Sequence, residues 1–135
     1  MSLVDHIRTE SARLAASCTA CGGCVRACPM TPYAAGVEAA DAGAVAWGMR
    51  DVLRDGAGTP EALAWIGACT RSGVCSAACP EGLDAAFMMR LATWRAKGAL
   101  GEAARIPVKE DTQLSAKVKA FARLTMTSEE VAEWL

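Results

Sequence analysis

With 135 residues and a formal net charge of −1, the chain has room for one compact domain and offers no basic surface for nucleic acid. No apolar run approaches the roughly 18–20 residues that span a bilayer, so no transmembrane segment is expected. The polar and charged residues among the first ten positions leave no apolar region for a signal peptide, which favours a cytoplasmic location.

The hydrophobic content leans heavily on alanine, and the aromatic residues are four Trp, two Phe and one Tyr. Alanine has the highest helix propensity, and alternating strand patterns are scarce, so we expect an all-α fold. An alanine-rich core buries little area per residue. We therefore expect bound metal to help hold the fold together.

In chain order, the first predicted helix covers residues 3–16 and leads into a cysteine group at 18–28, closed by Pro29. A short helix can form over 33–40, and a helix is expected over 44–54. The three tryptophans at helical spacing are predicted to be core residues: Trp47, Trp65 and Trp94.

A new helix is predicted at Thr59, because Pro60 follows as its first residue and a carboxylate stands in its first turn. That helix leads into a second cysteine group at 69–79, closed by Pro80. Asp84 is expected to cap the helix after this group. The helix covers 85–97 and ends at Gly98.

A third section begins after Pro107, with helices predicted over about 112–124 and 128–135. Thr127 and Glu130 have the spacing of a capping box before the last helix. These patterns divide the chain into a domain over 1–100 and a helical extension over 101–135. The extension either packs on its own domain or docks on another protein chain.

The first cysteine group has the spacing C-x2-C-x2-C-x3-C-P, which is typical of iron–sulfur clusters. Its cysteines are Cys18, Cys21, Cys24 and Cys28. A cubane cluster needs thiolates from several directions at short range, and Gly22 and Gly23 let the backbone approach it without a side-chain clash. The alternative is zinc, but a third cysteine two residues after a C-x2-C pair is surplus to the usual paired zinc pattern. In a reducing compartment, seven cysteines also favour metal ligation over disulfides.

The second group repeats this frame with Cys69, Cys75 and Cys79, and Ser72 stands where the second cysteine would be. Its spacing, C-x5-C-x3-C-P, resembles the three-iron motif of the iron–sulfur subunits of succinate dehydrogenase and fumarate reductase. The two groups together, separated by helices over roughly residues 3–100, resemble the α-helical ferredoxin family. The small size of the chain favours the branch similar to the small iron–sulfur subunit of heterodisulfide reductase.

The resemblance implies a crossed ligation, in which the cysteine before each proline serves the other cluster. Cys18, Cys21, Cys24 and Cys79 would then bind a [4Fe–4S] cluster, and Cys28, Cys69 and Cys75 would bind the second cluster. In the small iron–sulfur subunit of heterodisulfide reductase, a fourth cysteine usually stands at the position of Ser72. The second cluster is therefore expected to be [3Fe–4S], to be [4Fe–4S] with an oxygen ligand from Ser72 or water, or to be lost. A serine hydroxyl is a poor iron ligand because its pKa is high.

The resemblance implies an electron-transfer subunit of a heterodisulfide reductase-like oxidoreductase complex, with a flavoprotein donor or a partner like the catalytic, cysteine-rich subunit of heterodisulfide reductase. Two alternatives remain. In one, the second cluster binds substrate at an open iron near Ser72; in the other, the chain is an iron–sulfur redox sensor. The sequence contains no Gly-rich phosphate loop, catalytic triad or paired-carboxylate site, so we expect no catalytic residues, flavin or nicotinamide on this chain. His6 is expected to be exposed, and Arg26 and Arg71 either moderate cluster charge or are solvated.

Overall fold

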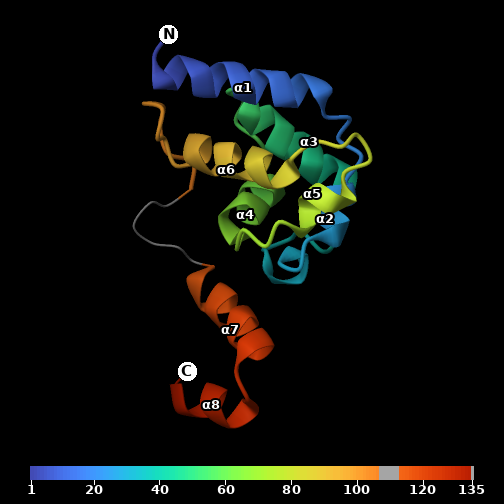
Figure 1. Cartoon of the computed structure of the whole chain (residues 1–135), viewed down its shortest axis with the longest axis vertical. Coiled ribbons are helices and arrows are strands. Elements are labelled where there is room, and N and C mark those ends of the chain that lie inside the picture. The colour runs from blue at the N-terminus through green and yellow to red at the C-terminus, as the bar shows by residue number, and fades with distance from the viewer. Residues whose placement is uncertain (107–112, 135) are drawn as a thin grey trace.

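The computed structural model describes residues 1–106 and 113–134, and every regular element in this part of the chain is a helix (Figure 1). The elements in chain order are α1 (Leu3–Ser17), α2 (Gly23–Ala27), a 3-10 helix η1 (Thr31–Tyr33), α3 (Ala42–Leu53), α4 (Pro60–Ala68), α5 (Val74–Ala78), α6 (Ala85–Ala96), α7 (Leu114–Thr125) and α8 (Ser128–Trp134). The all-α prediction is confirmed for these residues. None of the helices described is long and apolar enough to cross a membrane.

Side-chain caps begin several of the helices where the sequence predicts them. Thr59 and Asp84 each accept a hydrogen bond from the backbone N–H three residues later, at 3.1 and 3.0 Å. Asp41 caps α3 in the same way, also at 3.0 Å, at a position where no cap is predicted. Thr127 and Glu130 form the predicted capping box before α8. These caps satisfy N–H groups that have no partner inside the helix.

The core lies between α1, α3, α4 and α6, and α3 packs against both α4 and α6. Its largest fully buried side chains include Trp65, Met49, Leu53 and Ile66. Buried alanines fill much of the remaining space between the helices: Ala15, Ala46, Ala62, Ala68, Ala92 and Ala96. Small side chains let the helices approach closely, which suits a core that contains few aromatic residues.

The body of the protein contains one backbone pattern twice. Cys18 follows α1 and Cys69 follows α4, and each begins a loop that continues into a five-residue helix, α2 or α5. Cys28 and Cys79 end these two short helices. Equivalent residues stand 51 positions apart, and α2 packs against α5 (Figure 1). The two cysteine groups therefore meet at one place in the fold.

A buried arginine connects the two repeats behind this meeting point. The Arg95 side chain is only 3 % exposed, forms an ion pair with Asp55 at 2.5 Å and donates a hydrogen bond to the Leu53 carbonyl at 3.0 Å. The Asp55 carboxylate is largely exposed, so the buried group of this pair is the Arg95 guanidinium, which would lose its counter-charge if Asp55 were removed. This contact therefore holds α6 against the end of α3.

Two details of the sequence prediction are wrong. The short helix over 33–40 is replaced by η1 and a series of turns, because Gly36 adopts a positive φ of 76° that breaks the helix. Trp47 and Trp94 are 52 % and 37 % exposed, whereas Trp65 is buried as predicted. Helical spacing puts residues on one face, but it does not say which face turns inward.

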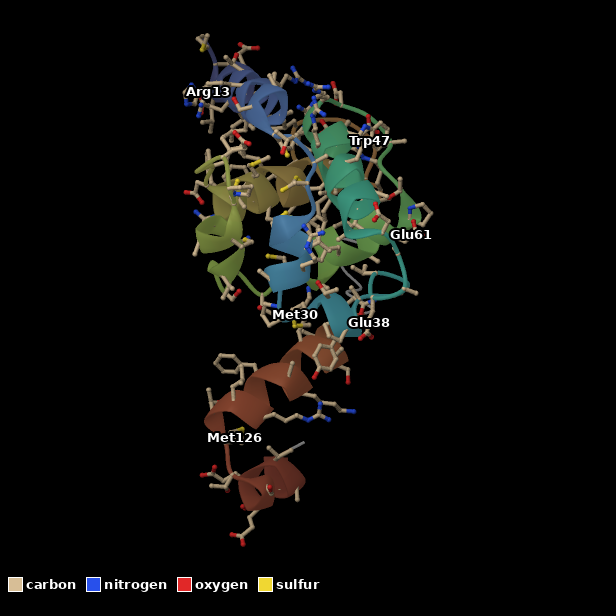
Figure 2. The ribbon with its side chains drawn as sticks, turned by 90° about the vertical axis from the view of Figure 1, so that its right-hand side faces the viewer. Arg13, Met30, Glu38, Trp47, Glu61 and Met126 are labelled. Carbon is tan, nitrogen blue, oxygen red and sulfur yellow. The ribbon has the colours of Figure 1, made fainter. Side chains whose placement is uncertain are left out.

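The helices α7 and α8 extend from one end of the body (Figures 1 and 2). Apolar side chains of α7 are exposed there, with Phe121 at 65 % and Leu124 at 82 %. The predicted start of this helix at 112 lies outside the described residues, as do Pro107 and Leu135.

Candidate metal centre

One pocket is lined by four of the seven cysteines. Cys18, Cys21 and Cys24 come from the first group, and Cys79 comes from the second. Helices α3 and α6 complete its walls with small and flexible apolar side chains: Ala46, Met49, Ala85 and Met88.

A second pocket of nearly equal size is lined by the other three cysteines. Cys69 and Cys75 belong to the second group, and Cys28 comes from the first. Ser72 also lines this pocket and is exposed to solvent. Its apolar walls come from α4 and α6: Trp65, Ala86 and Met89.

Each group thus contributes its last cysteine, the one before proline, to the pocket of the other group. Cys79 lines the first pocket and Cys28 lines the second. This grouping coincides with the two ligand sets that the resemblance implies. It follows from the packing of α2 on α5, because the two cysteines end these neighbouring helices.

Helix α6 forms a wall of both pockets. Ala85 and Met88 line the first pocket, while Ala86 and Met89 line the second. Consecutive residues of an α-helix point in directions about 100° apart, so one helix presents a different pair of side chains to each side. The position of α6 therefore determines the shape of both pockets.

The two cysteine loops have the same local backbone. Ala20 and Arg71 stand at equivalent positions and both adopt a left-handed conformation, with φ of 54° and 62°. The N–H of each donates to the thiol sulfur two residues earlier, Cys18 Sγ or Cys69 Sγ, at 3.4 Å. Left-handed backbone costs about 1–2 kcal/mol in a residue with a side chain. The same cost recurs in both loops, and in both the strained turn aims an N–H group at a cysteine.

Burial and neighbouring thiols raise the pKa values of one cysteine in each pocket. Burial, followed by repulsion from Cys18, raises the pKa of Cys24 to about 12. Burial and repulsion from Cys69 also raise the pKa of Cys75. Because the thiolate is the form that binds metal, loading of these cysteines would release protons.

A buried polar group in the second pocket has no partner in the described protein. Trp65 is 1 % exposed, and its indole Nε1 makes no hydrogen bond with the described residues. Buried indole N–H groups usually find an acceptor. Trp65 lines the second pocket, so an acceptor held there is a candidate partner for this donor. The sequence gives no sign of this unpartnered N–H group, because helical spacing identifies Trp65 only as a core residue.

The remaining predicted residues do not belong to the two sets of cysteines. His6 is exposed on α1, as expected. Arg26 donates a hydrogen bond to the Cys21 carbonyl at 2.9 Å, and Arg71 lines the second pocket. Within residues 1–106 and 113–134, no three His, Cys, Asp or Glu side chains are grouped so that they could hold a metal ion. The cysteines instead line the pocket walls.

Comparisons of the chain with protein-family models, curated proteins and solved structures give no match.

Proposed function

We propose that the chain is an electron-transfer protein that holds two iron–sulfur clusters side by side. The observation that carries the proposal is the division of all seven cysteines between two adjacent pockets, four in one and three in the other. Each pocket draws cysteines from both repeats. Bound clusters would therefore join the two halves of the domain, and their binding energy would contribute to folding.

The first pocket would hold a [4Fe–4S] cluster through Cys18, Cys21, Cys24 and Cys79. The second would hold its cluster through Cys28, Cys69 and Cys75, with Ser72 beside the fourth corner. The clusters supply one-electron redox chemistry, and the chain sets their separation, exposure and hydrogen bonding.

Two features of the pockets support clusters over single ions. Thiolates bound to one zinc ion lie about 2.3 Å from it and so meet around a point. A cluster is larger than one ion, and the four cysteines on the walls of the first pocket surround a space that a cluster could fill. The unpartnered Trp65 N–H also fits a sulfur acceptor in the second pocket.

We assign three irons to the second cluster. Ser72 occupies the position equivalent to Cys21, and its hydroxyl would have to lose a proton of high pKa to bind iron. Ser72 is exposed, so water reaches this corner of the pocket.

The resemblance supports a place for this chain between a flavoprotein donor and a partner like the catalytic subunit of heterodisulfide reductase. The chain presents two neighbouring pockets and an exposed apolar face on α7, which suits a protein that works within a complex.

Anaerobic purification with iron and sulfide analysis and electron paramagnetic resonance (EPR) tests the proposal. We expect about seven irons per chain and an oxidised three-iron signal that disappears on reversible one-electron reduction. About eight irons would replace the three-iron assignment with two four-iron clusters, and about four would remove the second cluster. Zinc in place of iron, or iron that undergoes no reversible reduction, would contradict the electron-transfer proposal.

The Ser72→Cys variant tests the assignment of the second cluster directly. It restores the fourth thiol of the repeat, so the iron content should rise from about seven to about eight and the three-iron signal should be lost. Thr70→Cys places a thiol in the same loop out of register and serves as the control. An unchanged three-iron signal in Ser72→Cys would contradict the position of the open corner.

A further inference from the structure

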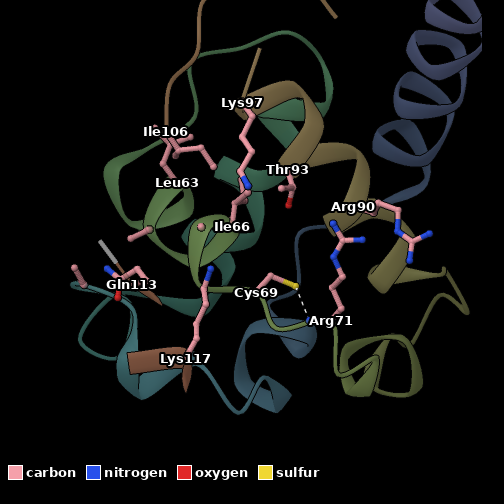
Figure 3. Close-up of a pocket in the computed structure, with 13 residues that line it drawn as sticks. Leu63, Ile66, Cys69, Arg71, Arg90, Thr93, Lys97, Ile106, Gln113 and Lys117 are labelled. Atoms are coloured by element: carbon pink, nitrogen blue, oxygen red, sulfur yellow. Dashed lines mark hydrogen bonds between the residues drawn. The ribbon is translucent and has the colours of Figure 1, made fainter. Parts of the chain in front are cut away.

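A separate cavity of about 360 Å³ lies beside the second cysteine pocket, between α4, α6 and the start of α7 (Figure 3). Cys69 and Arg71 line both this cavity and the second cysteine pocket. Its volume is in the range of pockets that hold small molecules. The electron-transfer proposal makes no use of this cavity.

The charge of the cavity lining is one-sided. Four basic side chains line it, and no Asp or Glu is among its described lining residues. The basic residues are Arg71, Arg90, Lys97 and Lys117. The whole chain has 15 acidic and 14 basic residues, so this lining departs from the average composition. A concave surface lined by one sign of charge concentrates ions of the opposite sign.

The positions of these groups suit an elongated ligand. Figure 3 shows Arg71 and Arg90 on one side of the cavity, while Lys97 and Lys117 reach into it from opposite directions. Arg71, Arg90 and Lys97 form no direct ion pair with other described residues, although the charge of Arg90 acts on the Asp84 carboxylate. A ligand with a negative charge at each end can therefore meet a basic side chain at each end. Binding to these three residues would break no direct ion pair.

The walls between the basic groups are apolar. Leu63, Ile66 and Ile106 line the cavity, and Ile66 is almost fully buried. Thr93 also lines the cavity, and its hydroxyl donates to the Met89 carbonyl at 2.7 Å, which leaves its oxygen free to accept. Apolar walls with a few polar groups select a ligand with a hydrocarbon body and charged ends.

We propose that this cavity binds a small aliphatic dianion, of the dicarboxylate class, against the Cys69 side of the second cysteine pocket. The proposal goes beyond electron transfer, and binding does not require that the cysteines hold iron. A ligand in the cavity would lie beside the loop that contains Cys69 and Arg71. It would then change the surroundings of any cluster held there.

Isothermal titration calorimetry of the purified chain at low ionic strength tests the proposal with three six-carbon probes: adipate, hexanoate and 1,6-hexanediol. They share a hydrocarbon chain and differ in charge. We expect adipate to bind, hexanoate to bind about tenfold more weakly and the diol not to bind. Equal affinities for adipate and hexanoate, or no adipate binding up to about 10 mM, would overturn the proposal.

Charge-removing variants locate the binding. Arg90→Gln combined with Lys97→Gln should weaken adipate binding about tenfold or more, because two cations of the lining are lost. Arg54→Gln, at an exposed arginine outside the cavity, should change it by less than about twofold. An equal loss of adipate affinity in the double variant and in Arg54→Gln would show a response to net charge alone and would overturn the cavity assignment.

NMR of the unaltered chain checks the site independently. Adding adipate should shift the amide signals of Gly67 and Thr93, and an absence of these shifts would also overturn the cavity assignment.

The two proposals can fail separately. Adipate binding in a chain without iron would keep the cavity and remove the electron-transfer role. A chain that holds about seven irons but does not bind adipate would keep the electron-transfer role and remove the cavity proposal. With both present, adipate should alter the EPR spectrum of the second cluster, which shares Cys69 with the cavity, and should leave the first unchanged.

Discussion

The two cysteine loops have nearly the same backbone but very different surroundings. Gly22 and Gly73 hold equivalent positions with φ of 83° and 78°. A Cβ on Gly22 would lie 2.6 Å from the Ala42 carbonyl carbon at the start of α3, whereas a Cβ on Gly73 would meet no described atom within 4 Å. The first loop is therefore packed against the body, and the second is open.

The charges near the two pockets also differ. Among the described residues, Glu81 is the only charged one that lines the first pocket, and Arg71 is the only one that lines the second. A positive charge and a nearby N–H donor stabilise the reduced state of a cluster. The comparison predicts that the second site has the higher reduction potential and accepts electrons from the first. Four pairs of variants test this comparison.

The largest effect is expected from the two crossing cysteines. Cys79→Ala should remove the cluster of the first pocket and keep the oxidised three-iron signal, whereas Cys28→Ala should remove that signal and keep the four-iron cluster. Each variant should also lose several kcal/mol of folding free energy, because in this proposal bound metal would link the two repeats. Iron analysis, EPR and thermal unfolding measure these losses.

Each cysteine variant is the control for the other. If each cysteine group held its own cluster, the two EPR results would be exchanged. Full iron content and unchanged thermal stability in Cys79→Ala would contradict metal binding at this residue altogether.

The next effect concerns the packed and the open loop. Gly22→Ala should cost about 2–4 kcal/mol of unfolding free energy, because strain at positive φ adds to a clash with the backbone of α3. Gly73→Ala should cost about 1–2 kcal/mol, from the strain alone. Urea unfolding of the purified variants compares the two. Equal losses would show that the start of α3 moves away at little cost.

A smaller effect is expected from the tryptophan of the second pocket. Trp65→Phe removes the buried N–H donor, so the reduction potential of the second cluster should fall by about 20–60 mV, as for one lost hydrogen bond. The potential of the first cluster should stay the same. An EPR-monitored redox titration separates the two sites.

Trp47→Phe is the matched control for this variant. Trp47 is exposed and lines neither pocket, so its replacement should leave both potentials unchanged. If Trp65→Phe also leaves the second potential unchanged, the indole N–H does not donate to a cluster sulfur.

How far the sequence predicts this structure depends on the range of the interactions involved. The caps at Thr59 and Asp84 act within three residues, so local sequence is enough to find them. The exposure of Trp47 and the burial of Arg95 depend on which helices pack together, and spacing along one helix does not contain this information.

The site shows the same limit. The cysteine spacings identify the two groups, but the sharing of Cys28 and Cys79 between pockets depends on the contact of α2 with α5 and entered the prediction only through a resemblance. The unpartnered N–H of Trp65 and the basic cavity have no local signal, because their residues come together only in the folded chain.

The smallest effect compares the caps of the helices that follow the two loops. Asp41 accepts one backbone N–H at the start of α3, whereas Asp84 accepts a backbone N–H at the start of α6 and the Ser76 hydroxyl of α5 at 2.9 Å. Asp84→Ala should therefore cost about 1 kcal/mol of unfolding free energy, and Asp41→Ala about 0.5 kcal/mol.

The cost of Asp84→Ala should also depend on pH. The hydrogen bonds from the Phe87 N–H and the Ser76 hydroxyl lower the pKa of Asp84 in the folded state. A lowered folded pKa adds stability above the unfolded value of about 3.9, and this stability is lost as the pH falls through the lower folded value. Urea unfolding should therefore show a full difference between the original chain and Asp84→Ala at pH 7, and a smaller one below about pH 4. A difference that stays constant over this range would mean that the aspartate contributes through packing and that its charge does not stabilise the link between α5 and α6.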